Sequence, residues 1–132
     1  MVTDLALLDA ATQARLHAYA PYSKFMVGAA VLAASGKVYT GCNVECASYP
    51  LTCCAERVAI YNAVSCGETA ILGVAVITDT DPAAGPCGAC RQVIVEFGPE
   101  AFVVIGSTTG ATRRTTIADL LPEFFDGARL RR

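Results

Sequence analysis

The sequence contains no run of more than two basic residues, and its ten Lys and Arg against twelve Asp and Glu give a formal net charge of -2. Proteins that hold nucleic acid by bulk electrostatics gather positive charge on one face, so we expect no nucleic-acid partner. The final Arg131-Arg132 pair is expected to be solvated charge. No stretch approaches the roughly 20 apolar residues of a membrane helix. Asp4 and Asp9 interrupt the apolar pattern of the first residues, which therefore does not indicate a signal peptide or a membrane partner.

The sequence also lacks internal repeats, low-complexity tracts and linkers, which predicts a single domain over residues 1–132. Charged residues make up only 17% of the chain, while hydrophobic residues make up 54%. A small chain that is this apolar and has no membrane span is expected to cover part of its surface by self-association. The composition therefore predicts an oligomer.

The seven cysteines are an odd number for a set of disulfides. Together with the absence of an export signal, this favours reduced thiols and a cytoplasmic location. Thiols at ligand-like spacing then indicate a metal site. The remaining Cys42, Cys46 and Cys66 are expected to be small buried hydrophobes. The sole histidine, His17, is expected to be a partly exposed residue of the first helix.

Strands and helices alternate along the chain, which predicts an α/β protein with helices packed on a layered sheet. Apolar runs of strand length predict strands at 27–34, 38–42, 71–78, 101–106 and 112–117. Helices are expected at 3–19, 54–65 and 87–97, with a short helical turn at 116–121. In the first helix, Leu5, Leu8, Thr12 and Leu16 are predicted to form the apolar side.

Two short segments carry the residues suited to metal chemistry: Cys-Ala-Glu-Arg at 54–57 and Pro-Cys-Gly-Ala-Cys-Arg-Gln at 86–92. Each lies where a loop enters a predicted helix. Cys87 and Cys90 are three apart and share a face of the first helical turn. The positive end of a helix favours the thiolate form. Two such helix ends could present Cys54, Cys87 and Cys90 to one zinc ion, which in a catalytic site keeps its fourth position for water.

Glu56 follows Cys54 by two residues, about 200° around a helix, and is therefore expected to act as an acid and base rather than as a ligand. Three thiolates and one zinc ion leave a net charge of -1, which needs compensation. Arg57 and the two helix ends are candidates for it. Other readings remain open: a redox pair, buried thiols, or a structural zinc site with a fourth ligand such as Cys53.

These segments resemble the zinc-dependent deaminases, whose motif is a His- or Cys-x-Glu segment followed by Pro-Cys-x-x-Cys. Pro-Tyr-Ser-Lys-Phe at 21–25, Val-Gly-Ala-Ala at 27–30, Gly-Cys-Asn-Val-Glu at 41–45 and Asp-Leu-Leu-Pro at 119–122 make the chain most similar to the small homotetrameric cytidine deaminases. The resemblance implies a three-layer α/β/α fold with a mixed sheet of about five strands and helices on both faces.

The resemblance also implies the roles of individual residues. Cys54, Cys87 and Cys90 would be the ligands of one zinc ion per subunit, and Glu56 the catalytic proton shuttle. Arg57 would offset the thiolate charge. The matching substrate-binding positions lie along the rest of the chain: Phe25 and the Ala55 amide at the base, Asn43 and Glu45 at the ribose, and Ala47, Tyr49 and Phe125 in a neighbouring subunit's site.

The expected function is hydrolytic deamination of cytidine and deoxycytidine in pyrimidine salvage. The zinc ion would lower the pKa of a water molecule. Glu56 would carry a proton from this water to the base, and it would then protonate the departing amine. The alternatives are a deaminase of another cytosine-containing small molecule and a non-catalytic zinc module for assembly. The sequence departs from the family at Cys46, where Asn is usual, and at Met26, where Pro is common.

Overall fold

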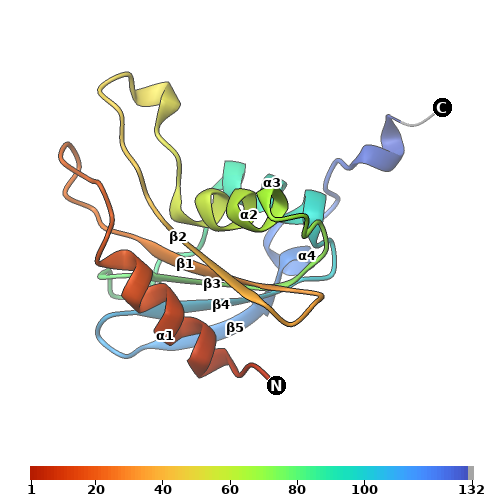
Figure 1. The fold of residues 1–132 in the computed structure, drawn as a ribbon, viewed down its shortest axis with the longest axis horizontal. Coiled ribbons are helices and arrows are strands. Elements are labelled where there is room, and N and C mark those ends of the chain that lie inside the picture. Colours follow the sequence, from red (N-terminus) through yellow and green to blue (C-terminus); the bar gives the residue numbers. More distant parts are fainter. Residues whose placement is uncertain (131–132) are drawn as a thin grey trace.

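A mixed five-stranded sheet forms the middle layer of the computed structural model, which describes residues 1–130 (Figure 1). The Arg131-Arg132 pair lies outside the described residues. The strands run in the order β2-β1-β3-β4-β5, and only β3 and β4 are parallel neighbours. Their bounds are β1 Gly28–Ala33, β2 Val38–Cys42, β3 Ile71–Thr78, β4 Phe102–Ser107 and β5 Thr112–Thr116. Each agrees with the strand expected from the sequence to within one residue.

The central strands are apolar throughout because helices cover both faces of the sheet. In β3, Val74 and Val76 belong to the core on one face, and Ala75 and Ile77 to the core on the other. Successive side chains of a strand point to opposite faces, so a strand buried on both sides has no polar positions to alternate with. This explains the continuous apolar run in the sequence.

The helices divide between the two faces of the sheet. Helix α1 lies on one face, and α2, α3 and the short α4 lie on the other (Figure 1). The expected three-layer α/β/α architecture is therefore confirmed. The helix bounds are α1 Asp4–Arg15, α2 Ala55–Ser65, α3 Gly88–Phe97 and α4 Ile117–Leu120, with 3₁₀ turns η1 Tyr49–Leu51 and η2 Gly127–Arg129.

The apolar side of α1 differs from the predicted one. Leu7, Leu8 and Ala11 are buried, whereas Leu5 and Leu16 are 68% and 64% exposed. The reason is a close approach between α1 and β1: a Cβ built on Gly28 would lie 2.0 Å from the Ala11 carbonyl oxygen. Small residues set this contact, so Leu8 is the one residue of the predicted apolar side that is buried.

Helix α1 also ends earlier than expected, at Arg15 instead of Tyr19. Tyr19 leaves the helix because its backbone pairs with the segment after β2, donating to the Asn43 carbonyl and accepting from the Glu45 amide, each at 2.9 Å. His17 consequently lies beyond the helix end and is exposed. The pairing brings the first loop beside the segment that carries Asn43 and Glu45.

The expectation for the cysteines outside the cluster was also partly wrong. Cys66 is exposed, because it follows the last residue of α2 at the surface, and Cys42 and Cys46 are only partly buried. All seven cysteines lie within the described residues and are free thiols. Within residues 1–130, no helix has the length and apolar character needed to cross a membrane.

Candidate metal centre and substrate cavity

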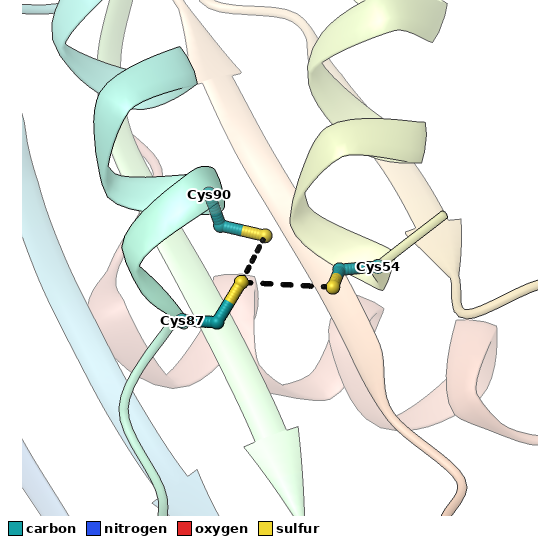
Figure 2. A group of neighbouring side chains, drawn as sticks. All are labelled: Cys54, Cys87 and Cys90. Atoms are coloured by element: carbon teal, nitrogen blue, oxygen red, sulfur yellow. Dashed lines mark hydrogen bonds between the residues drawn. The ribbon is translucent and has the colours of Figure 1, made fainter. Parts of the chain in front are cut away.

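Three cysteine sulfurs meet between the first turns of α2 and α3. Cys54 approaches from the start of α2, and Cys87 and Cys90 approach from α3, with their sulfurs turned toward one another (Figure 2). The Sγ atom of Cys87 lies 3.7 Å from that of Cys54 and 3.4 Å from that of Cys90. All three sulfurs lie within 4.8 Å of one another. The two motifs, 33 residues apart in sequence, thus form one cluster.

The spacing of the sulfurs fits a zinc ion. Tetrahedral zinc with Zn–S bonds of about 2.3 Å places neighbouring sulfurs about 3.8 Å apart. The 3.7 and 3.4 Å separations are close to this value. Glu56 does not belong to the cluster, and Cys53, which adjoins Cys54, does not either. A set of three thiols leaves one tetrahedral position for a non-protein ligand.

The backbone of each helix end favours negative charge on this cluster. Cys54 and Cys87 are the N-cap residues of α2 and α3, both in extended conformation, and neither side chain caps its helix with a hydrogen bond. The sulfurs therefore remain free for a metal, next to the unpaired N–H groups and positive dipole of each helix. The N-cap role also explains why both helices begin one residue later than predicted.

Hydrogen bonding between the thiols shifts their acidities in opposite directions. The neighbouring Cys90 thiol, followed by Arg57 and Cys87, lowers the pKa of Cys54 to about 5. The same contact with Cys54, together with burial, raises the pKa of Cys90. The cluster therefore carries a thiolate near neutral pH, which is the protonation state that a metal requires.

Arg57 supplies positive charge to the cluster. Its Nη2 atom lies 3.5 Å from the Cys54 sulfur, and this contact raises the pKa of the guanidinium. Its Nε atom is buried and has no hydrogen-bond partner among residues 1–130. Three thiolates, one divalent zinc and one guanidinium sum to zero. A neutral total is what a partly buried site requires.

Glu56 is a buried carboxyl group beside the cluster. The residue is only 4% exposed and lies in the first turn of α2. Burial raises the pKa of Glu56 to about 7, and the nearby Cys54 charge acts in the same direction. A carboxyl group that titrates near neutral pH can both accept and donate a proton. The position of α2 that brings Glu56 here depends on Gly41, because a Cβ on Gly41 would lie 2.4 Å from the Ala59 nitrogen.

A cavity of about 300 Å³ opens beside the thiols and Glu56. Its size is at the lower end of the range for small-molecule sites. The wall includes five of the residues expected to act in catalysis or substrate binding, together with two of the cysteines. These are Phe25, Asn43, Glu45, Ala55 and Glu56, with Cys54 and Cys87. Two of the three expected zinc ligands therefore line one cavity together with residues expected at the base and at the sugar.

Asn43 and Glu45 are buried side chains fixed by the loop before β1. The Asn43 Oδ1 atom accepts from the Val27 amide at 2.9 Å, and its Nδ2 atom donates to the Phe25 carbonyl at 2.6 Å. These partners fix the orientation of the amide, because a backbone N–H can only donate and a carbonyl can only accept. Glu45 Oε1 accepts from the amides of Tyr22 and Ser23 at 3.0 and 3.1 Å.

Cys46 and Met26, the two residues that depart from the family pattern, each have a backbone group that is hydrogen-bonded to a nearby side chain. The Cys46 amide donates to Thr52 Oγ1 at 3.1 Å, so a threonine hydroxyl holds the loop at this position. Met26 is partly buried, and its carbonyl accepts from Arg15 Nε at 2.9 Å.

Three expected substrate-binding residues do not join the others. Within the described part of the chain, the cavity wall does not include Ala47, Tyr49 or Phe125. Tyr49 and Phe125 are 58% and 56% exposed. Tyr49 lies in η1, within a loop that extends away from the sheet (Figure 1). Phe125 belongs to the C-terminal segment, which extends away from the sheet on another side (Figure 1).

Sequence reasoning missed several residues of the wall. Ser23, Thr52 and Thr78 contribute hydroxyl groups, and Gly85 contributes backbone. Ser23 belongs to the Pro-Tyr-Ser-Lys-Phe segment, which was a usable signal. Thr78 ends β3, whose neighbour β4 is parallel, and sites in α/β sheets often lie at such carboxyl ends. Nothing in the sequence distinguishes Thr52.

The chain is similar to known proteins in sequence and in fold. Residues 1–106 match the family model described as the cytidine and deoxycytidylate deaminase zinc-binding region. A cytidine deaminase from Sporosarcina psychrophila is 48% identical over 120 residues, covering 90% of this chain and 88% of that protein. The crystal structure of cytidine deaminase from Burkholderia pseudomallei has a TM-score of 0.90 and 48% identity, covering 93% of this chain and 99% of the other. A blasticidin-S deaminase from Bacillus cereus is 32% identical, with coverage of 90% and 89%.

Proposed function

The chain belongs to the cytidine and deoxycytidylate deaminase zinc-binding family, and we propose that it hydrolyses cytidine and deoxycytidine to uridine and deoxyuridine with release of ammonia. The observation that carries this proposal is the shared cavity. Its wall contains the buried carboxyl group of Glu56, thiols of the zinc cluster, and the side chains of Asn43 and Glu45. A proton carrier, a metal cluster and sugar-binding groups in one wall suit a cytosine nucleoside.

Cys54, Cys87 and Cys90 would hold the zinc ion, in keeping with their sulfur spacing. When bound, zinc with an open position lowers the pKa of a water molecule toward 7 and so supplies hydroxide as a nucleophile near neutral pH. Arg57 and the N-termini of α2 and α3 would keep the thiolate charge from cancelling this effect.

Glu56 would move the protons of the reaction. Its pKa of about 7 suits a group that accepts a proton from water and later returns it. The proton passes first to the ring nitrogen next to the amine-bearing carbon, which makes that carbon electrophilic. A C–O bond then forms at this carbon. Glu56 takes the remaining proton of the added hydroxyl group and delivers it to the amine, and the C–N bond breaks to give ammonia and a carbonyl group. The balanced reaction consumes one water for each ammonia released.

Asn43 and Glu45 would recognise a hydroxyl group of the sugar. With Oδ1 and one Nδ2 proton already engaged, Asn43 retains one N–H as a donor. An ionised Glu45 offers acceptors only. Hydrogen bonding to Ser23 lowers the pKa of Glu45 and so keeps it ionised. A donor beside an acceptor complements a hydroxyl group, which both accepts and donates. Phe25 and the Ala55 amide would contact the base.

A free nucleoside is favoured over the other cytosine compounds. The net charge of -2 argues against a polynucleotide, which needs a positive surface. A relative at 48% identity bears the name cytidine deaminase, whereas the one named blasticidin-S deaminase is 32% identical. The wider similarity to the cytidine deaminase supports cytidine over that antibiotic as the substrate.

We further propose that the chain forms a homotetramer with shared active sites. Ala47, Tyr49 and Phe125 lie outside the cavity wall of their own chain as described, and the two aromatic side chains are exposed. Exposed aromatic groups on projecting segments are suited to completing a neighbour's site. The seven free thiols support the cytoplasm as the location.

One assay tests the proposed function. Purified chain, with its zinc content measured, is mixed separately with cytidine, deoxycytidine, cytosine and cytidine monophosphate, and ammonia is followed. The proposal predicts rapid release from the first two and little from cytosine, which lacks the sugar. A zinc-loaded protein that turned over none of the four would instead be an assembly module. Blasticidin S is assayed as a fifth compound, and its turnover without turnover of cytidine would assign the antibiotic as the substrate.

A further inference from the structure

Two hydrogen bonds through Ser23, in the turn formed by residues 20–25, link Phe25 and Glu45, which both line the cavity. The Phe25 amide donates to Ser23 Oγ at 3.0 Å, and Ser23 Oγ in turn donates to Glu45 Oε2. Ser23 thus joins the residue assigned to the base with the carboxylate assigned to the sugar. Ser23 itself lines the cavity.

The direction of this path is fixed by its ends. A backbone N–H can only donate, so the Ser23 oxygen accepts from Phe25, and the single hydroxyl proton is left for Glu45. Glu45 Oε1 is already occupied by the amides of Tyr22 and Ser23. The hydroxyl of Ser23 is the partner that binds the second oxygen, Oε2, and so sets the rotation of the carboxylate plane.

We propose that Ser23 is a positioning residue for sugar recognition: its hydroxyl holds the Glu45 carboxylate so that the one lone pair left on Oε2 faces the sugar hydroxyl that cytidine and deoxycytidine share at the 3′ position. This inference rests on the proposed function, in which Glu45 binds the sugar. The Ser23 hydroxyl also lowers the pKa of the Glu45 carboxyl, and this effect is larger than that of the nearby Lys24 charge. A carboxylate fixed in advance loses less rotational freedom when the sugar binds.

The position of Phe25, the residue assigned to the base, depends less on Ser23 than the position of Glu45 does. Phe25 is held a second time, because Asn43 Nδ2 donates to its carbonyl at 2.6 Å. The turn is also closed by the Lys24 amide, which donates to the Ala20 carbonyl at 3.0 Å. Loss of the Ser23 hydroxyl therefore leaves Phe25 anchored while Glu45 Oε2 loses its partner. The effect is expected on substrates that have the 3′-hydroxyl.

The test compares Ser23→Ala with Ser23→Thr, which keeps the hydroxyl, on cytidine and 3′-deoxycytidine. We expect Ser23→Ala to lose about tenfold in kcat/KM for cytidine, which is the size expected for one hydrogen bond to a charged group. The loss should appear as a higher KM, with kcat nearly unchanged. The value for 3′-deoxycytidine should stay within about twofold, and Ser23→Thr should behave as the parent. Equal losses on both substrates, or no loss on either, would overturn the proposal.

Two further measurements keep the outcome decisive. Ser23→Cys keeps the shape of the side chain but has only a weak S–H donor, so it should repeat the Ser23→Ala pattern if the alanine variant folds poorly. A carboxyl titration by NMR should show a higher pKa for Glu45 in Ser23→Ala than in Ser23→Thr, and an identical pKa would contradict the positioning role. A parent chain that deaminated no nucleoside would refute the proposed function, and the titration would then decide on Ser23 alone.

Discussion

The Nη2 atom of Arg57 lies 3.5 Å from the sulfur of Cys54, the N-cap residue of the same helix, three residues earlier. One helical turn thus carries a thiol, the buried carboxyl group of Glu56 and the cation that balances the thiol. The arrangement ties charge compensation to the same short segment that provides the proton carrier. Replacing Arg57 therefore alters the metal site without touching the substrate wall.

We expect Arg57→Ala to retain a folded chain but to lose about 10- to 100-fold in zinc affinity or kcat/KM, the usual effect of removing a partner of a metal ligand. The physical reason is the net negative charge left on three thiolates and zinc. Competition with a zinc-binding dye and steady-state kinetics measure the two quantities. Arg129→Ala, at an exposed position in η2, is the matched control and should change neither.

Zinc content should depend on three cysteines and be independent of the others. Alanine at Cys54, Cys87 or Cys90 removes one sulfur of the cluster and should reduce bound zinc from one per chain to nearly none. Elemental analysis after dialysis measures this. Cys53→Ala and Cys66→Ala are the controls, since neither sulfur belongs to the cluster. Loss of zinc from Cys53→Ala would mean that the ligand set has been assigned wrongly.

The raised pKa of Glu56 predicts a pH-dependent stability once zinc is removed with a chelator. The carboxyl pKa rises from 4.5 to about 7 on folding. Its contribution to stability is therefore complete below pH 4.5 and is lost as the pH rises through 7. The loss amounts to about 3 kcal/mol, at about 1.4 kcal/mol for each pKa unit. Glu56→Gln cannot ionise and should escape the loss.

Urea unfolding of the parent and Glu56→Gln, both chelator-treated, checks this sign. At pH 4.5 the two chains should have similar free energies of unfolding, and at pH 8 the glutamine variant should be the more stable. A difference between the chains that stays constant from pH 4.5 to 8 would show that burial does not raise this pKa.

Much of the fold was predictable from the sequence because the dominant signals were local. Apolar runs such as Ile71–Thr78 identified the strands, and the spacing of Cys87 and Cys90 placed both on one helical turn. The buried side of α1 was not predictable, since it depends on small residues such as Ala11 and Gly28 meeting across the structure. The Ser23–Glu45 contact joins residues 22 positions apart, and only the paired loops bring them together.

Shared active sites predict rescue between inactive variants. Phe125→Ala should impair the neighbour's site, and Glu56→Gln the site of its own chain. When the two variants are refolded together, some sites receive an intact Glu56 from one chain and an intact Phe125 from another. Activity of the mixture should therefore exceed the sum of the separate activities. A mixture of Glu56→Gln with Cys87→Ala is the control without rescue, because both residues line the same cavity of one chain.

The rate of Glu56→Gln tests the central claim most directly, namely that the buried carboxyl group of Glu56 carries the protons of a zinc-dependent deamination. The glutamine keeps the shape of the side chain but cannot accept a proton. Zinc content and cytidine deamination are measured on the same preparation. We predict one zinc per chain and a kcat lower by at least about 100-fold, within the usual contribution of proton transfer. A zinc-loaded variant that kept a substantial fraction of the parent rate would contradict the account.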